Sequence, residues 1–206
     1  MRILMVTDVC CPRVNGVSTS IQTFRRELRS LGHDVVLIAP DYGTPPPDDA
    51  DVIRIPGRPV PFDPEDRLMR WRRLRELSPR LAGSGFDLVH IQTPFLAHYA
   101  GVAFSNVLDV PRVETYHTYF EEYFHHYVRF LPKPSLKALA RRFSRSQCNE
   151  LDGVVVPSQQ MKAVLAGYGV AAPMEVISTG LALEDFAAGD GAAEGGDTRH
   201  PVRRVG

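Results

Sequence analysis

Three neighbouring residues near the start of the chain could bind a phosphorylated ligand. Asn15-Gly16-Val17 stands between a short apolar run and the beginning of a helical pattern. A glycine in front of a helix lets backbone N–H groups approach a diphosphate, and the helix dipole adds attraction. The same spacing suits a turn glycine that backbone geometry requires. We therefore treat this loop as a candidate phosphate site with that alternative open.

Two further side chains could act on a bound ligand. His117 follows the apolar segment Pro111–Thr115, and Asp8 follows the first apolar run. The histidine could donate a proton to a ligand or stabilise charge that develops on it; a loop histidine chosen blindly is more often exposed and idle. Asp8 could contact a hydroxyl of a ligand or could form an Asx-type turn. Position in the fold has to decide between these interpretations.

Three other clusters resemble catalytic or metal sites but have simpler explanations. Asp49-Ala50-Asp51 is formally a D-x-D pattern, but it lies in a Pro-rich acidic loop that we expect to be solvated. Glu121-Glu122 would point about 100° apart on a helix and make a poor acid–base pair. His125-His126 has no partner at metal-ligand spacing. We assign no metal and expect no cofactor.

The elements that must position these residues alternate between strand and helix. The apolar runs Ile3–Val6 and Val35–Ile38 flank a helical pattern that starts at Ser18 and is stopped by Gly32, which makes a βαβ unit. Further strands are predicted at 52–55, 86–91, 111–115, 154–156 and 174–177. Helices are predicted at 65–81, after the Pro-rich passage 56–64, and at 95–106, 134–151 and from a Ser158 cap to about Gly167. This order predicts an α/β fold, a Rossmann-like parallel sheet with helices on both faces, whose ligands bind outside the carboxyl ends of the strands.

Composition excludes several classes of protein. The 206 residues have a formal net charge of zero, which gives no argument for a nucleic-acid partner. No apolar run reaches about 18 residues, and the N-terminus is too short for a signal peptide, so cytoplasm is the default. Cys10, Cys11 and Cys148 form neither a disulfide framework nor a zinc pattern. Residues 187–206, rich in glycine and alanine, are predicted to be a disordered tail after a folded part at 1–186.

An aromatic and basic stretch suggests a surface for anionic lipid. Seven of the chain's eighteen aromatic residues lie between Tyr116 and Phe130. The following helical pattern has an apolar face formed by Leu136, Leu139, Ala140 and Phe143. Its cations are Arg129, Lys133, Lys137, Arg141, Arg142 and Arg145. Such a helix suits an anionic membrane face, and a second Arg-rich helix over 67–80 weakly supports it; a packed helix with a solvated basic face is the alternative.

Six segments together resemble the N-terminal half of retaining family 4 glycosyltransferases of the GT-B fold. They are Val-Asn-Gly-Val-Ser-Thr (14–19), Arg-Ser-Leu-Gly-His-Asp-Val (29–35), Phe-Asp-Leu-Val-His-Ile-Gln-Thr-Pro (86–94), Thr-Tyr-His-Thr-Tyr-Phe (115–120), Val-Val-Val-Pro-Ser (154–158) and Val-Ile-Ser-Thr-Gly-Leu (176–181). Their order and spacing make the match specific. The aromatic segment after His117 is most similar to members with lipid or polyprenyl-type acceptors.

The resemblance implies roles for individual residues. The loop at Asn15, Gly16 and Val17 would contact the phosphates of a nucleotide-sugar donor, and His117 would lie at the sugar. We add one more residue to the donor side and assign five to the acceptor side of the cleft. These are Ser158 for the donor, and Asp8, Thr93, Tyr116, Thr118 and Tyr119 for the acceptor.

The resemblance also implies a second domain that this sequence lacks. In such enzymes the second Rossmann-like domain binds most of the nucleotide-sugar and carries a pair of glutamates. Here the sequence passes the hinge at 179–181 and enters the Gly/Ala tail. We therefore expect a hexosyltransferase half with little transfer alone, peripheral at the inner membrane face. The rival hypothesis is a non-catalytic module that binds a lipid, a glycan or a separate donor-domain polypeptide.

Overall fold

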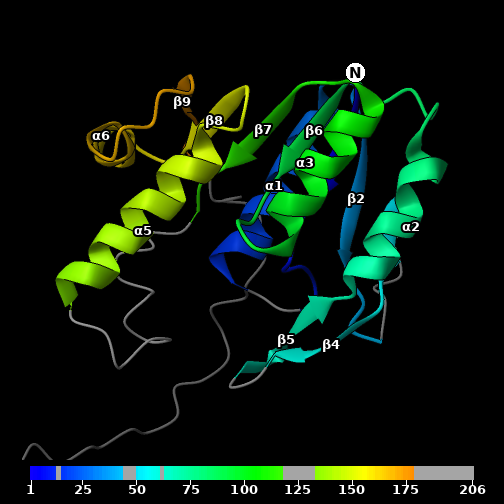
Figure 1. The fold of residues 1–206 in the computed structure, drawn as a ribbon. Helices are drawn as coiled ribbons and strands as arrows, with labels where there is room; N and C mark the ends of the chain where they lie inside the picture. The colour runs from blue at the N-terminus through cyan, green and yellow to red at the C-terminus, as the bar shows by residue number, and fades with distance from the viewer. Residues whose placement is uncertain (13–14, 44–49, 61–62, 118–132, 179–206) are drawn as a thin grey trace, which may run out of the picture.

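A seven-stranded parallel sheet forms the centre of the protein (Figure 1). The computed structural model describes residues 1–12, 15–43, 50–60, 63–117 and 133–178. The strand order is β3-β2-β1-β6-β7-β8-β9, and each neighbouring pair is parallel. The strands are β1 (Arg2–Val6), β2 (Asp34–Pro40), β3 (Val52–Ile55), β6 (Leu88–Ile91), β7 (Arg112–Thr115), β8 (Gly153–Val156) and β9 (Met174–Val176). The predicted α/β fold class is confirmed.

The strand order reverses beside β1. The chain builds outward from β1 through β2 to β3, and then returns to place β6 on the other side of β1. In open parallel sheets this topological switch point is where the carboxyl ends of strands leave a crevice for ligands. The segments that leave β1 and β6, which begin at Thr7 and Gln92, therefore border the expected site.

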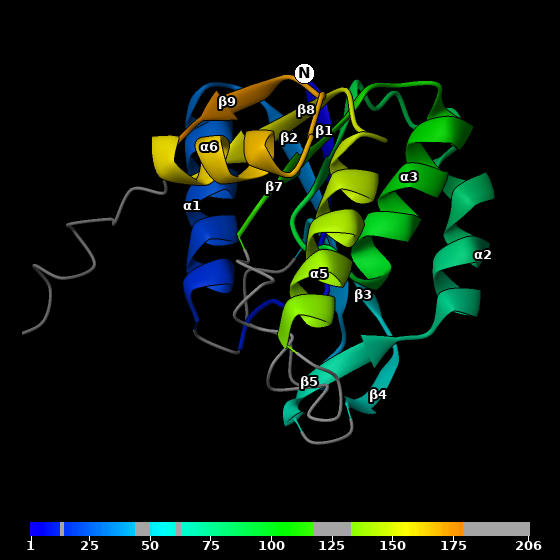
Figure 2. The same cartoon turned by 60° about the vertical axis from the view of Figure 1, so that its left-hand side comes forward.

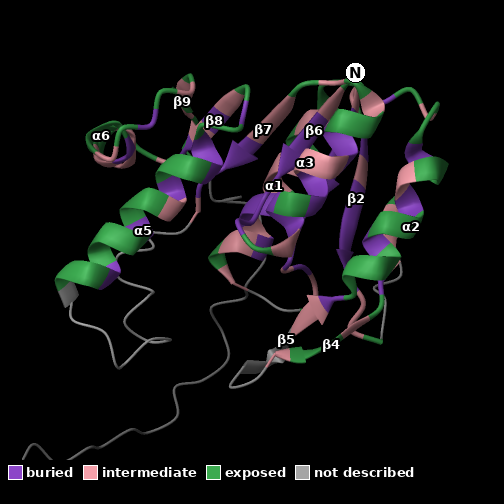
Figure 3. Cartoon of the chain, viewed as in Figure 1, coloured by how far each residue is buried: buried purple, intermediate pink, exposed green. Residues whose placement is uncertain are grey.

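Helices cover both faces of the sheet (Figure 2). On one face, alternate residues of β1 and β2 pack with Ile21 of α1 (Gly16–Ser30). On the other, Leu4 and Val6 join a larger core with Leu74 of α2 (Trp71–Leu81) and Phe104 of α3 (Leu96–Leu108). The remaining helices are α5 (Lys133–Cys148) and α6 (Gln159–Gly167). Figure 3 shows that the central strands are buried along most of their length.

The helix predicted over 65–81 is wrong in its first part. Residues Asp63–Met69 form strand β5, which pairs antiparallel with β4 (Gly57–Val60), and the helix begins only at Trp71. Met69 is buried in the larger core. Antiparallel pairing with β4 and the burial of Met69 stabilise this hairpin, and helical periodicity does not report either of them. Arg67 consequently lies on a strand, so the second Arg-rich helix is shorter than predicted.

Several sequence predictions concern residues outside the described ranges. They include the tail at 187–206, most of the aromatic segment, Asp49, and the pairs Glu121-Glu122 and His125-His126. The division into a folded part at 1–186 and a tail stays a prediction.

Candidate active site at the carboxyl edge of the sheet

Asp8 and Thr93 join the ends of β1 and β6 at the switch point. The backbone N–H of Asp8 donates to Oγ1 of Thr93 at 2.7 Å, and that hydroxyl donates to Oδ2 of Asp8 at 2.9 Å. Both residues are buried. The two segments that the sequence analysis assigned to the acceptor side are thus held together by a closed pair of hydrogen bonds.

The Asp8 carboxylate also caps helix α3. The backbone N–H of Ala97 lies 3.2 Å from Oδ1 and 3.1 Å from Oδ2. A carboxylate at a helix N-terminus satisfies backbone donors and complements the helix dipole. Burial nevertheless raises the pKa of Asp8 to about 6. These oxygens have internal partners, and a contact with an acceptor hydroxyl stays a prediction for both Asp8 and Thr93.

His117 lies next to Gln92 on the same edge. Nε2 of His117 is 3.2 Å from Oε1 of Gln92, which follows β6 directly and is fully buried. Burial lowers the pKa of His117 to about 4, so the ring is neutral at neutral pH and offers one donor and one acceptor. Gln92 was not among the residues predicted for the site. The sequence feature that could have indicated it is a polar residue directly after a buried strand.

A second histidine lies deeper in the sheet. His90 is buried, and its Nε2 is 2.8 Å from Oγ1 of Thr115, which ends β7. Burial, together with the nearby charge of His117 when that ring is protonated, lowers the pKa of His90 to about 3. The rings of Phe24 of α1 and His90 pack edge to face. In the sequence His90 is one residue of an otherwise apolar strand, so no pattern marked it as a site residue.

Helix α5 is hydrogen-bonded to the segments that follow β7 and β6. The buried hydroxyl of Tyr116 lies 2.8 Å from that of Ser144, and Nε2 of Gln147 donates to the Pro94 carbonyl at 2.8 Å. The Tyr116 side chain is therefore buried against α5, and its predicted contact with an acceptor stays a prediction. Thr118 and Tyr119 lie outside the described residues.

The candidate phosphate loop forms the start of α1. Asn15 is the N-cap: its Oδ1 accepts from the Ser18 N–H at 2.8 Å, and its N–H donates to Oγ of Ser18 at 2.9 Å. Gly16 does not have a positive φ, and a Cβ on it would meet no atom of the described residues within 4 Å. Backbone geometry thus gives no reason for this glycine, whereas close approach of a ligand would. Val17 packs against the apolar cluster that Ile21 of α1 forms with β1 and β2.

Ser158 caps the other helix that starts at this edge. It follows β8 and accepts from the Met161 N–H at 3.2 Å as the N-cap of α6. The cap predicted from sequence is confirmed. Its role toward a donor stays a prediction, because the hydroxyl has this partner already.

The basic surface of α5 is solvent-exposed. Lys137, Arg141, Arg142 and Arg145 are exposed, while Leu136 and Ala140 are buried beneath them. Leu139, predicted to lie on the apolar face, is 48% exposed instead. Arg129 lies outside the described residues, and Lys133 is the first residue of α5, with no described side chain.

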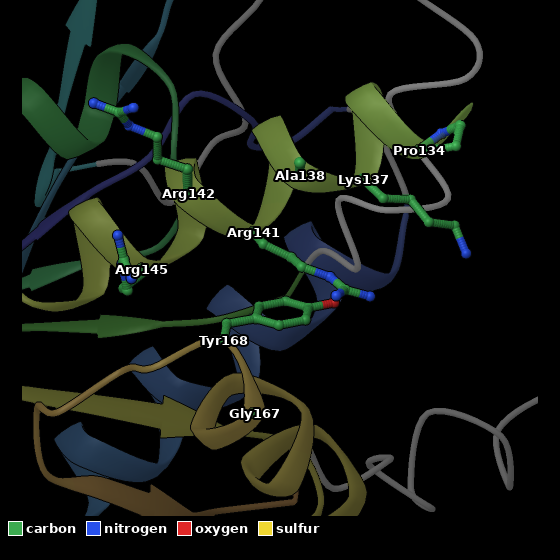
Figure 4. A pocket seen from close by; sticks show the side chains of 8 residues that line it. All are labelled: Pro134, Lys137, Ala138, Arg141, Arg142, Arg145, Gly167 and Tyr168. Carbon is green, nitrogen blue, oxygen red and sulfur yellow. The ribbon is translucent and has the colours of Figure 1, made fainter. Parts of the chain in front are cut away.

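A cavity of about 520 Å³ lies between α5 and the end of α6 (Figure 4). Its lining includes all four exposed cations of α5, and Arg141 stacks on the ring of Tyr168 at 5.4 Å. Figure 4 shows that Arg142 points away from Arg141. The cavity lies on the flank of the sheet, and none of the described residues of the carboxyl edge is among its lining residues.

Metal and membrane-spanning features are absent from the part of the chain that the structure describes. No three His, Cys, Asp or Glu residues gather there as a group that could hold a metal, and Asp51 is paired with Arg29 at 2.8 Å. None of the helices described there combines the length and the apolar character needed to cross a bilayer. The expectation that no metal or cofactor is needed stays a prediction.

Comparison with known proteins identifies the family. The sequence profile of Glycosyltransferase Family 4 matches residues 14–185. The chain belongs to glycosyltransferase family 4. The match spans α1, the sheet from β2 to β9, and every described residue of the site except Asp8.

Two curated relatives of this family 4 chain are glycolipid synthases. The alpha-monoglucosyldiacylglycerol synthase of Streptococcus pneumoniae is 34% identical over 189 residues, which cover 90% of this chain and 42% of the relative. That of Acholeplasma laidlawii is 27% identical over 194 residues, covering 90% of this chain and 48% of the relative. The chain thus spans less than half the length of these relatives.

A solved structure supports the assignment of the fold. The crystal structure of Anabaena Alr3699/HepE in complex with UDP-glucose has a TM-score of 0.58 at 14% identity, and the match covers 88% of this chain and 44% of that one. At this level of identity the likeness concerns the fold. The family 4 chain therefore has the Rossmann-like fold of one half of a GT-B enzyme.

Proposed function

We propose that this family 4 chain forms the acceptor-side half of a retaining glycosyltransferase. The complete enzyme would transfer a hexose from a nucleotide-sugar to a lipid or glycan acceptor. The observation that carries the proposal is the position of His117, neutral and half-buried beside Gln92, at the edge where parallel sheets bind ligands. The names of the two glycolipid synthases favour a diacylglycerol-type acceptor.

The geometry supports a division of labour between two elements. The N-terminus of α1, with open space around Gly16, would accept the negative charge that grows on the leaving diphosphate. His117 would hydrogen-bond the sugar. An acceptor hydroxyl would then attack the anomeric carbon from the face that the diphosphate leaves, so that its configuration is retained. Orientation of the substrates and electrostatic stabilisation would supply the catalysis, without a metal.

A second Rossmann-like domain is needed to complete this site. It would bind most of the nucleotide-sugar and close over the carboxyl edge. The length of the curated relatives supports this requirement, because each is more than twice as long as the matched region. A separate polypeptide could supply that domain, and the chain alone would then transfer little sugar.

Contact with an anionic membrane is the second part of the proposal. The exposed cations of α5 would bind phosphate headgroups, and Leu139, exposed among them, would insert its apolar side chain into the membrane. At the start of α2, Trp71 is likewise an exposed apolar side chain between cations: it is 40% exposed and lies between Arg70 and Arg72 in the chain. Such a surface would bring the edge of the sheet to a lipid acceptor at the inner face of the membrane.

The proposed function is tested with a chimera. The chain replaces the matched region of the Streptococcus pneumoniae synthase, and glucose transfer from UDP-glucose is measured on vesicles that contain diacylglycerol. The unaltered chimera should transfer sugar, and His117→Ala should lower kcat by about 100-fold or more, the size expected when one stabilising hydrogen bond of the transition state is lost.

His33→Ala in the same chimera is the matched control, because His33 precedes β2 at the opposite edge of the sheet. It should keep most of the activity. Equal activity of the two variants would refute the role of His117. A chimera that binds the acceptor vesicles but transfers nothing would favour the non-catalytic module instead.

A further inference from the structure

A backbone hydrogen bond fixes the position of Gln92. Its N–H donates to the carbonyl of Val6 at 2.9 Å, just beyond the end of β6, and the residue is 0% exposed. This bond fixes the first residue after β6 against the neighbouring strand β1 at the switch point. The side chain of Gln92 therefore starts from a rigid support.

The contact with His117 has a defined direction. The atom that faces Nε2 of His117, at 3.2 Å, is the amide oxygen of Gln92. With the Gln92 amide in this orientation its oxygen can only accept, so the ring nitrogen carries the proton and donates it. Among the described residues, Gln92 is the only hydrogen-bond partner of this ring.

The other half of the Gln92 amide has no partner in the described part of the chain. Its Nε2 is buried and makes no hydrogen bond. A buried donor without a partner destabilises the folded state, and an apolar side chain of the same size would avoid that cost. Packing alone therefore does not account for a glutamine here, whereas the contact with His117 does.

We propose that Gln92 is a positioning residue that holds His117 in the neutral tautomer with the proton on Nε2. Nδ1 is then left as the acceptor of the ring, available to a hydroxyl of the sugar or of the acceptor. The nearby His90 is buried, and Nε2 of that ring lies 2.8 Å from Oγ1 of Thr115. The use of this tautomer in sugar transfer rests on the proposed function.

The tautomer is directly measurable by NMR in the chain as it is. Nitrogen-15 shifts of the His117 ring distinguish Nε2–H from Nδ1–H near neutral pH, where burial keeps the ring uncharged. The wild-type chain should show the Nε2–H form. Gln92→Met should lower the ratio of Nε2–H to Nδ1–H about fivefold, the effect of one lost hydrogen bond. Gln92→Glu, which keeps an accepting oxygen, should retain the Nε2–H form.

Gln147→Met is the matched control. It removes another buried glutamine amide, one that donates to the Pro94 carbonyl, and should leave the His117 tautomer unchanged. An Nδ1–H form in the wild-type chain would overturn the proposal even if Gln92→Met does not fold. So would an unchanged ratio in Gln92→Met, or an equal change in Gln147→Met. The NMR result is independent of sugar transfer, so an inactive chimera with the expected tautomer would refute the proposed function alone.

Discussion

At the scale of single residues, the site consists of buried polar groups, and their burial controls their protonation. Asp8 is the clearest case, because its carboxylate caps α3 and yet has a pKa raised to about 6. His90 and His117 are shifted in the opposite sense, toward the neutral ring. Near neutral pH the edge therefore carries two uncharged imidazoles and a carboxylate whose pKa lies only slightly below the pH.

Substitution of Asp8 by Asn should change how stability depends on pH. Since the folded state raises the pKa of Asp8 from 3.8 to about 6, the stabilisation it contributes is complete below the lower value and is lost as pH rises through the upper one. Relative to Asp8→Asn, the wild-type chain should lose about 2 kcal/mol of unfolding free energy between about pH 4 and about pH 7.

Urea denaturation of both proteins at the two pH values checks this. The comparison cancels the contributions of His90 and His117, whose lowered pKa values make stability fall as pH decreases. A difference in unfolding free energy that does not vary with pH would show that Asp8 titrates normally.

At the scale of elements, helix starts and strand ends do the positioning. Two helices begin at the carboxyl edge with polar caps from their own sequence, Asn15 for α1 and Ser158 for α6. A third, α3, is capped by Asp8 from the segment that follows β1. The N-terminus of α1 differs from the other two, because its first residue is a glycine with open space beside it.

The variant Gly16→Ala distinguishes an effect on stability from an effect on ligand binding. The added Cβ meets nothing, and alanine favours a helix by up to about 1 kcal/mol, so stability should stay equal or rise slightly. If donor phosphates approach the backbone here, the same methyl group should raise the KM for UDP-glucose in the chimera by about tenfold, a size typical of one misplaced contact.

Gly167→Ala at the end of α6 is the control, since a Cβ there also meets nothing and the residue is away from the edge. Its KM should equal that of the unaltered chimera. An unchanged KM in Gly16→Ala would remove the α1 loop from the donor site.

At the scale of the whole molecule, the chain presents two distinct surfaces. One is the polar carboxyl edge, and the other is the exposed basic side of α5. Tyr116 and Gln147 connect them, because their hydrogen bonds tie α5 to the segments that follow β7 and β6. A membrane bound to α5 would thus lie on a helix that is rigidly joined to the site.

The membrane surface is tested by flotation with vesicles of anionic and of neutral lipid. Arg142→Gln removes one cation from α5 and should weaken binding to anionic vesicles about fivefold, since each surface cation contributes about 1 kcal/mol. Arg26→Gln on α1 removes the same charge from the opposite face of the sheet and should have no effect. Equal binding of the two variants, or binding that ignores lipid charge, would leave α5 with a solvated basic face.

The sequence by itself determined the alternation of elements and the edge at which chemistry gathers. Buried strands are short apolar runs, and the helix caps at Asn15 and Ser158 depend on residues within one turn, so both leave local signals. Only the tertiary structure showed β5 in place of the first part of a helix, the exposure of Leu139 and the partners of Asp8 and His117. Those features depend on pairing and packing with other segments, in some cases far apart in the chain, such as Gln92 and His117 at 25 positions. The periodicity of a single segment does not encode such contacts.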